Sequence, residues 1–302
     1  MKNSAARNVS RGAVRAALVA GSVLALSASS SLSAPAAQQV DLKLILATDV
    51  SGSINDEEAD LQRQGTADAF ADPDVIKSIQ SGALGRIAVA MIDFSSPEYD
   101  KVVLDWHIIR DKKSALEFSE AIRALPRTPG RRTSVSSALE LGSTLIEASA
   151  GDIVATRRVI DVSGDGPNND GNPMREVHDR VIAQGIVVNG LPIMDDNANG
   201  YYPDLDKYYQ ACVAGGRGSF VVVVRSFKDF GQAMRHKLIL EVSGIDPPTK
   251  FANRLPLKKE LLTKAAAGGN PLNGPQVMRP GQNEYSEHCD IAGGFYGRFN
   301  RF

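Results

Sequence analysis

Residues 49–53 read DVSGS and follow the run LKLILA at residues 42–47. The run predicts a strand, and the polar, glycine-containing segment after it predicts a tight turn. A carboxylate and two hydroxyls at alternate positions, Asp49, Ser51 and Ser53, would converge on one point in such a turn. Hard cations such as Mg²⁺ prefer oxygen ligands in this kind of arrangement. Taken alone, the pattern also fits a turn followed by a helix cap.

Strand-like and helix-like segments alternate through the chain beyond this motif. The predicted strands lie at 42–47, 87–92, 102–104, 158–162, 186–191 and 220–224. The predicted helices lie at 55–70, 114–125, 134–148, 174–183, 205–213 and 226–242. This alternation predicts an α/β domain in which a mostly parallel sheet carries helices on both faces. In such sheets, ligands bind beyond the carboxyl ends of the strands.

Two further motifs fall on strand-to-helix loops at the same predicted edge. The segment GRRTSVSSAL at 130–139 places the hydroxyl of Thr133 at the start of a helix. The segment VIDVSGDG at 159–166 places the carboxylate of Asp165 just past the end of a strand. Asp161 lies within that strand, and we expect it to form a hydrogen bond in the core. Because loops after parallel strands share one edge, the three motifs can meet there.

The order and spacing of these motifs resemble the von Willebrand factor A domain and its metal-ion-dependent adhesion site. More narrowly, VIDVSGDGPNN at 159–169 and NGLPI at 189–193 resemble a bacterial family, domain of unknown function 1194. The resemblance covers about residues 40–244. It implies a von Willebrand A-like, Rossmann-like sheet of six strands, mostly parallel, with one antiparallel edge strand.

The resemblance also implies a set of metal ligands. Ser51, Ser53 and Thr133 would bind the ion, and Asp49 and Asp165 would bind it directly or through water. The expected ion is Mg²⁺, with Mn²⁺ or Ca²⁺ as alternatives. A degenerate site that keeps the fold and binds nothing is the other reading.

Two arginines depart from the pattern of the family. Arg131 and Arg132 stand where many such domains carry small residues. Pointing inward, they would weaken metal binding, and pointing outward they would favour an anionic ligand. They also fit an ordinary pair of solvent-facing side chains on a loop.

A second, weaker metal motif is DDNANG at 195–200, with Asp206 at the twelfth place of the loop. It matches the start of a calcium-binding loop. It departs from that loop by ending in Asp rather than Glu, by placing Pro203 at the ninth position and by following a strand. A polar surface loop is the favoured interpretation, and a second Ca²⁺ between Asp195 and Asp206 is the alternative.

The chain divides into three predicted parts, beginning with a signal peptide at 1–36. Its first 15 residues carry four positive charges and no acid, an apolar stretch follows at 16–26, and APA at 34–36 resembles a cleavage site. An uncleaved anchor is the alternative. The second part, 37–244, is the von Willebrand A-like domain. The third, 245–302, is a Pro- and Gly-rich extension with one possible helix at 257–267.

The mature chain contains two cysteines, Cys212 and Cys289. An exported protein enters an oxidising compartment, so we expect the two thiols to pair, with two separate buried thiols as the alternative.

Charge and missing motifs narrow the class of function. The formal charge of −1 becomes −5 once four positive and no negative charges leave with residues 1–36, which argues against nucleic-acid binding. The four histidines form no ligand-spaced pair, and the sequence lacks HExxH, Walker and GxSxG motifs. We therefore expect a periplasmic or secreted, non-enzymatic module that binds an acidic residue of a protein partner through its metal. A metal-supported enzyme or enzyme subunit, and a structural envelope component with an empty site, are the alternatives.

Overall fold

A mixed seven-stranded sheet forms the centre of the domain, in the order β3-β2-β1-β4-β5-β6-β7. The computed structural model describes residues 37–195, 202–244, 276–283 and 286–290. The strands are β1 (Gln38–Asp49), β2 (Ile87–Phe94), β3 (Lys101–Ile109), β4 (Ile153–Gly164), β5 (Val187–Pro192), β6 (Val221–Val223) and β7 (Gln276–Met278). Strands β2, β1, β4, β5 and β6 are parallel, and the edge strands β3 and β7 are antiparallel to their neighbours.

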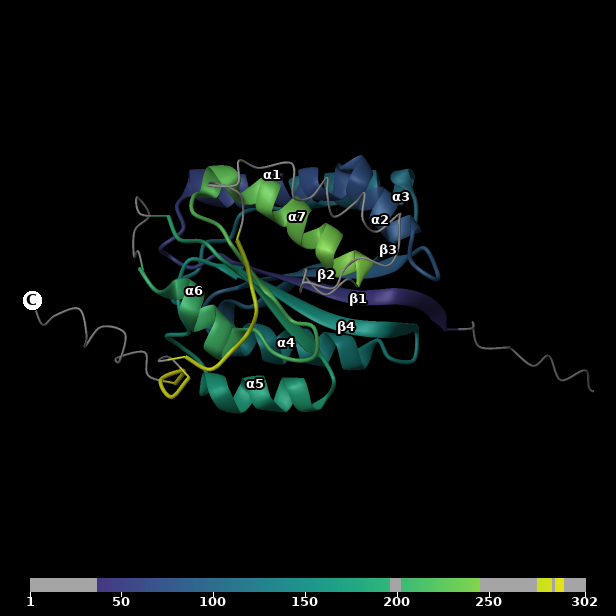
Figure 1. Ribbon diagram of the computed structural model, residues 1–302. Helices are drawn as coiled ribbons and strands as arrows, with labels where there is room; N and C mark the ends of the chain where they lie inside the picture. Colours follow the sequence, from purple (N-terminus) through teal and green to yellow (C-terminus); the bar gives the residue numbers. More distant parts are fainter. Residues whose placement is uncertain (1–36, 196–201, 245–275, 284–285, 291–302) are drawn as a thin grey trace, which may run out of the picture. The chain divides into compact units, whose positions relative to one another are not determined.

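Helices cover both faces of this sheet (Figure 1). One layer contains α1 (Asp56–Ala71), α2 (Pro73–Gln80), α3 (Lys112–Arg123) and α7 (Phe230–Ser243). The other contains α4 (Val135–Ala148) and α5 (Met174–Ala183), followed by the short α6 (Leu205–Tyr208) and the π-helical turn η2 (Tyr209–Val213). Two 3₁₀ turns, η1 (Pro97–Tyr99) and η3 (Phe227–Asp229), lie in loops. Within the described residues, no helix has the length and apolar character needed to cross a membrane.

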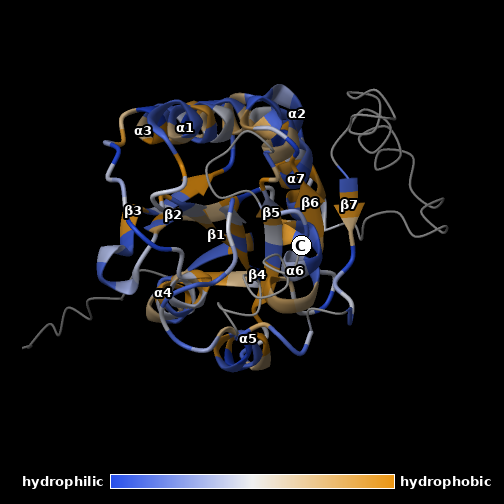
Figure 2. Cartoon of the chain, turned by 90° about the vertical axis from the view of Figure 1, so that its left-hand side faces the viewer, coloured by the Kyte–Doolittle hydropathy of each residue, from blue (hydrophilic) through white to orange (hydrophobic). Residues whose placement is uncertain are grey.

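The order of the strands creates a switch point between β1 and β4. The chain leaves β1 toward β2 and β3 on one side, then returns to place β4 on the other side of β1. The register pairs Thr48 with Ser163, so the two strands end at the same level. Loops diverge at such a point and leave a crevice beyond the carboxyl ends, where α/β sheets bind ligands. Figure 2 shows the domain from this edge.

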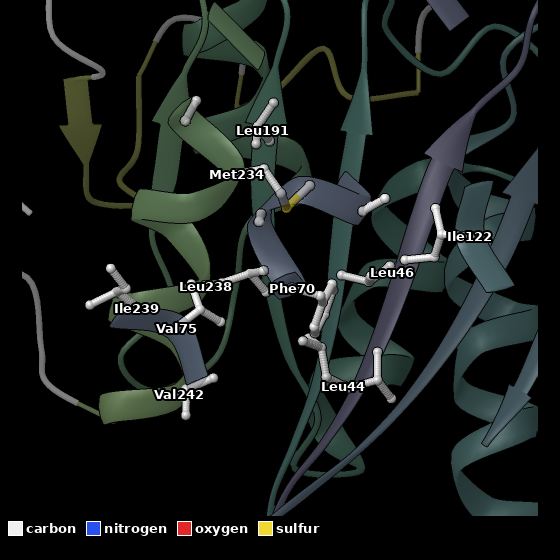
Figure 3. Close-up of a cluster of buried hydrophobic side chains, with 14 of the residues drawn as sticks. Leu44, Leu46, Phe70, Val75, Ile122, Leu191, Met234, Leu238, Ile239 and Val242 are labelled. Atoms are coloured by element: carbon white, nitrogen blue, oxygen red, sulfur yellow. The ribbon is translucent and has the colours of Figure 1, made fainter. Parts of the chain in front are cut away.

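The strands are apolar because both of their faces are covered. All eight residues of β2 are buried, as are the last eight of β1. On the α1 and α7 face, Leu44, Leu46, Phe70 and Leu238 belong to one buried cluster (Figure 3). Each fully buried Leu or Phe side chain contributes about 1.5–3 kcal/mol to stability, so this layer anchors the strands that carry the loops.

The predicted fold class is confirmed, with three differences in detail. The described part of the sheet has seven strands rather than six, because Gln276–Met278 of the predicted extension pairs with β6. Helix α2 was not predicted, since Asp72 both ends α1 and caps α2 and leaves no loop between them. Asp161 forms an ion pair with Lys237 instead of the expected core hydrogen bond. The possible helix at 257–267 lies outside the described residues.

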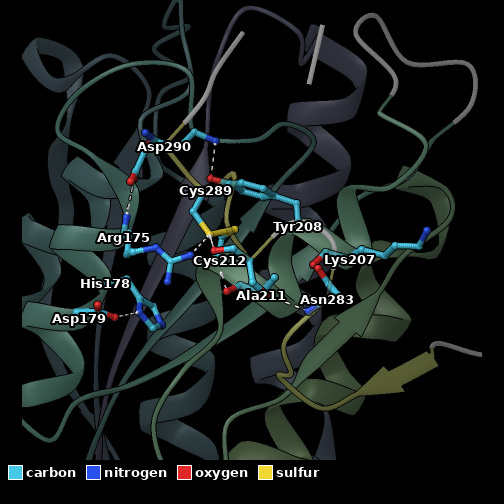
Figure 4. The surroundings of a disulfide bond; sticks show 12 residues. Arg175, His178, Asp179, Lys207, Tyr208, Ala211, Cys212, Asn283, Cys289 and Asp290 are labelled. Carbon is cyan, nitrogen blue, oxygen red and sulfur yellow. Dashed lines mark hydrogen bonds and ion pairs between the residues drawn. A yellow bond between two sulfur atoms is a disulfide. The ribbon is translucent and has the colours of Figure 1, made fainter. Parts of the chain in front are cut away.

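A disulfide joins Cys212 in η2 to Cys289 (Figure 4), as the sequence predicts. Arg175, at the start of α5, donates its backbone N–H to Asp290 at 2.9 Å, and its guanidinium donates to the Cys289 sulfur at 3.8 Å. Asn283 donates to the Lys207 carbonyl at 3.0 Å. The C-terminal segment is therefore fixed to α5, α6 and η2 by covalent and polar contacts.

A buried charged cluster lies between α7 and the sheet. Lys237 pairs with Asp161 and lies 3.9 Å from Glu241, whose carboxylate also accepts a hydrogen bond from Asn189. Burial, followed by the charge of Asp161, raises the pKa of Glu241 to about 7, although Lys237 and Arg157 act in the opposite direction. The folded protein therefore retains a proton on Glu241 at pH values where the unfolded chain has released it.

We predict that the Cys212→Ser/Cys289→Ser double variant has a free energy of unfolding about 4 kcal/mol below wild type, because the disulfide closes a loop with a sequence separation of 77. Urea denaturation measures this difference, and reduced wild-type protein should match the variant. An unchanged denaturation midpoint would contradict the prediction.

We also predict that the stability of the wild type falls between about pH 5 and pH 8, and falls less in Glu241→Gln. The pKa of this carboxyl is about 7 when folded against 4.5 for the ordinary group, so folding takes up a proton in this window and raising the pH opposes it. Denaturation at several pH values tests the difference, with the exposed Glu176→Gln as control. Parallel curves for wild type and Glu241→Gln would count against it.

Candidate functional site

Side chains from two loops meet at the β1–β4 switch point. Asp49 is the last residue of β1, and its Oδ1 accepts a hydrogen bond from the backbone N–H of Ser51 at 2.8 Å. The hydroxyls of Ser51 and Ser53 lie 3.1 Å apart. The Ser53 hydroxyl donates to Oδ1 of Asp165 at 2.7 Å. The loop after β1 is thereby linked to the loop after β4 by a continuous chain of polar contacts.

Thr133 lies on the loop between α3 and α4, rather than on a strand-to-helix loop as the sequence predicts. Backbone pairing between loops brings it to the same place. The N–H of Gly52 donates to the Arg131 carbonyl at 3.1 Å, and the N–H of Gly130 donates to the Val50 carbonyl at 2.7 Å. The Thr133 hydroxyl oxygen lies 3.4 Å from the position that a Cβ on Gly166 would take. Because Gly166 directly follows Asp165, the predicted ligands of all three motifs gather at one edge.

Ser95, at the end of β2, supports the Thr133 loop and was not identified from the sequence. Its hydroxyl donates to the Arg132 carbonyl at 2.7 Å and accepts from the Arg131 N–H at 2.8 Å, and its carbonyl accepts from the Ser134 N–H at 2.8 Å. A Cβ on Gly130 would lie 1.9 Å from the Ser95 hydroxyl, so this position requires glycine. The signal in the sequence was the position of Ser95, which directly follows a buried strand at the ligand-binding edge.

Two asparagines of the GPNN segment also hold this loop in place. The side-chain oxygen of Asn169 accepts from the Thr133 N–H at 3.0 Å, and the Asn169 N–H donates to the Thr133 carbonyl at 2.8 Å. The side-chain oxygen of Asn168 accepts from the Ser136 N–H at 2.9 Å. The sequence motif included both residues, but their role depends on a pairing between distant loops.

The two carboxylates of the site carry poorly compensated negative charge. Asp49 and Asp165 are 1% and 3% exposed. Burial and the neighbouring charge of Asp165 raise the pKa of Asp49 well above its ordinary value. Burial raises the pKa of Asp165 to about 6, with the Ser53 hydroxyl opposing and Glu58 adding to the rise. Among the described residues, no Lys or Arg forms an ion pair with either carboxylate.

The donor atoms present fit a hydrated divalent cation. Asp49 Oδ2 and Asp165 Oδ2 are both buried, and neither has a hydrogen-bond partner among the described residues. A Cβ on Gly164 would lie 2.8 Å from that Asp49 oxygen, so the carboxylate packs directly against the glycine, where a side chain would displace it. Two carboxylates with neutral hydroxyls form the oxygen-rich environment that Mg²⁺ prefers. In the described part of the chain, no cluster of three or more His, Cys, Asp or Glu side chains offers another arrangement.

The two arginines near the site face solvent. Arg131 and Arg132 are exposed, and Arg132 donates to the Asn169 carbonyl at 3.2 Å. They therefore leave the negative charge of the buried carboxylates unpaired. Of the second, calcium-like loop, residues 196–201 lie outside the described residues. Asp195 accepts from the Phe227 N–H at 3.3 Å and Asp206 accepts from the Lys207 N–H at 2.9 Å.

Comparison with known proteins places most of this domain in one family. Residues 39–246 match the family described as "Protein of unknown function (DUF1194)". A search of curated proteins found no match.

Three of the solved structures to which the chain is similar come from different kinds of protein. Proximal thread matrix protein 1 from the mussel byssus is 18% identical over 68% of this chain and 49% of its own, with a TM-score of 0.48. The pilus adhesin SpaC from Lactobacillus rhamnosus GG is 15% identical over 69% of this chain and 31% of its own, with a TM-score of 0.47. A von Willebrand factor type A protein from Catenulispora acidiphila is 15% identical over 68% and 43%, also with a TM-score of 0.47. The matched region spans less than half of each of these proteins.

We predict that Gly164→Ala lowers the affinity for Mg²⁺ by about 10-fold or more, because the added methyl group would lie 2.8 Å from the Asp49 oxygen and displace the carboxylate. Calorimetric titration measures the change. Gly151→Ala is the control, since a methyl group there would meet no described atom within 4 Å. Equal affinity in Gly164→Ala and wild type would show that the position of the Asp49 carboxylate does not affect metal binding.

Proposed function

The chain belongs to the DUF1194 family, and from that premise we propose that it is an exported protein-binding module whose binding depends on one divalent cation. The family description assigns no activity, so the proposal rests on the site itself. The observation that carries it is the pair of buried carboxylate oxygens, on Asp49 and Asp165, that face the site without partners among the described residues. Removing such groups from water is costly unless a charge or a hydrogen bond compensates them.

Five residues would hold the ion. They are Asp49, Ser51, Ser53, Thr133 and Asp165, the set that the sequence resemblance implies. Two carboxylates balance the charge of one divalent ion, and the three hydroxyls are neutral donors of oxygen. When bound, the ion would supply an electrophilic centre that accepts a carboxylate from a partner. Mg²⁺ or Mn²⁺ fits this oxygen set, and Ca²⁺ is the third candidate.

The loops around the site would determine which partner binds. Arg131 and Arg132 are exposed in the loop that also carries Thr133. Guanidinium groups bind carboxylates through two parallel hydrogen bonds, so they favour a partner surface with additional acidic residues. The proposed partner is therefore a protein that presents a carboxylate within an acidic patch.

Binding without catalysis is part of the proposal. An enzyme working at this ion would also need a general base within hydrogen-bond reach of the substrate. Asp49 and Asp165, the two carboxylates at the switch point, are both used to compensate the ion. A metal-supported enzyme is one alternative. A structural component with an empty site is the other, and the experiment below tests it.

Location outside the cytoplasm is part of the proposal. The predicted signal peptide at 1–36 would direct export to the periplasm or the medium. The disulfide between Cys212 and Cys289 is suited to an oxidising compartment.

We predict that Asp49→Ala and Thr133→Ala bind Mg²⁺ more than about 100-fold more weakly than wild type, because each removes an oxygen from the site. Metal-free Asp49→Ala should melt at or above the wild-type temperature, since the substitution removes a buried charge. Calorimetric titration and thermal melts measure both effects. The exposed Asp179→Ala and Thr144→Ala are matched controls that should behave as wild type.

Capture of partners from envelope extracts should be lost in the same two variants and in chelator. If wild-type protein binds no divalent ion at millimolar concentration, the proposal fails and the scaffold alternative gains support. If Asp49→Ala loses the ion and still captures partners, the ion is not the point of contact.

A further inference from the structure

We infer that Tyr209 is an additional positioning residue of the divalent-cation site, its hydroxyl hydrogen-bonding the hydrated ion on the Asp49 side. This inference rests on the proposed function and adds a group that none of the three sequence motifs contains. Tyr209 begins η2, a five-residue π-helical turn. π-Helical turns are rare and often occur at functional sites.

A glycine on β5 leaves room for the ring of Tyr209. A Cβ on Gly190 would lie 2.7 Å from Cδ1 of Tyr209 and 3.5 Å from a methyl group of Val221. A side chain there would collide with the ring. The ring therefore lies directly against the β5 backbone, in the part of the sheet next to β4.

A second glycine, on β4, leaves space at the end of the ring. A Cβ on Gly164 would lie 3.0 Å from the Tyr209 hydroxyl and 2.8 Å from Oδ2 of Asp49. The phenol oxygen and the carboxylate oxygen thus both lie against Gly164. Strand β5 carries Gly190 where the ring approaches the backbone, and β4 carries Gly164 where the hydroxyl approaches it.

The Tyr209 hydroxyl is a buried polar group. Its residue is 0% exposed, and the oxygen forms no hydrogen bond among the described residues. An unsatisfied buried hydroxyl costs about 1–3 kcal/mol, so its retention calls for a compensating ligand. Three unpartnered oxygens share this edge, namely those of Tyr209, Asp49 and Asp165.

The protonation state of the Tyr209 phenol suits a hydrogen bond to the hydrated ion. Burial, followed by the charge of Asp49, raises the pKa of Tyr209 well above its ordinary value. The phenol is therefore neutral at physiological pH and keeps both its donor hydrogen and its acceptor lone pairs. A water molecule of the ion's hydration shell can donate to the phenol oxygen, and the phenol hydrogen can be donated to a carboxylate oxygen.

The adjacent tyrosine provides a matched comparison. Tyr208 is equally buried, but its hydroxyl accepts a hydrogen bond from the Asn168 N–H at 3.3 Å. Tyr208→Phe therefore removes a satisfied structural hydroxyl, whereas Tyr209→Phe removes an unsatisfied one beside Asp49. Only the second change should act directly on the ion.

The test is calorimetric titration with Mg²⁺ of the full mature chain in wild type, Tyr208→Phe, Tyr209→Phe and Asp49→Ala. We expect the affinity of Tyr209→Phe to fall about 10-fold, the size typical of losing a group that supports metal ligands, and that of Tyr208→Phe to change less than twofold. The near-ultraviolet difference spectrum on adding Mg²⁺ reports on the phenol itself. Its tyrosine band should be present in wild type and Tyr208→Phe and strongly reduced in Tyr209→Phe.

Thermal melts in chelator separate this role from a structural one. Metal-free Tyr209→Phe should melt no lower than wild type, because it loses only an unsatisfied hydroxyl. If Tyr209→Phe binds Mg²⁺ as wild type does while Asp49→Ala does not, the inference is overturned and the proposed site stands. If both tyrosine variants lose affinity and melt at lower temperature, Tyr209 is merely structural. If wild type binds no divalent ion, the proposed function and this inference fail together.

Discussion

The burial of two carboxylates side by side is the constraint around which this edge of the domain is arranged. Asp49 and Asp165 are withdrawn from water, repel each other and have no cationic side chain as partner among the described residues. A protein can maintain such a pair by protonating one member or by binding a cation. The surrounding hydroxyls favour the cation, because they are not needed to hold a proton.

The topology of the sheet makes this arrangement possible. Both carboxylates lie at the ends of central strands whose apolar side chains pack against helices on both faces. The loops, in contrast, are held to one another by short polar contacts through Ser95 and Asn169. Rigid strands therefore fix the separation of the carboxylates, and the loop contacts fix the orientation of the hydroxyls. A site for Mg²⁺ would require this division, because the ion tolerates little deviation from its preferred geometry.

Much of this could be predicted from the sequence, because it depends on local patterns. The alternating segments predict the sheet, and Asn55 with Glu58 predicts the start of α1, where both capping hydrogen bonds are present. The parts that escaped prediction depend on contacts between distant segments. Strand β7 is three residues long and forms only against β6. Tyr209 looks like an ordinary core residue until Gly164 and Gly190 are seen beside it.

The pairing of β7 with β6 has a consequence for how the chain reaches its folded state. Until Gln276–Met278 arrives, the valine-rich strand Val221–Val223 presents an unpaired edge, the kind of surface through which nascent chains associate with one another. Those residues lie near the C-terminus, and Cys289 lies further on still. In an exported chain, β7 would therefore cover this edge only late in translocation. Formation of the Cys212–Cys289 disulfide would then fix the C-terminal segment in place. During that interval, the edge would be open to pairing with other extended chains.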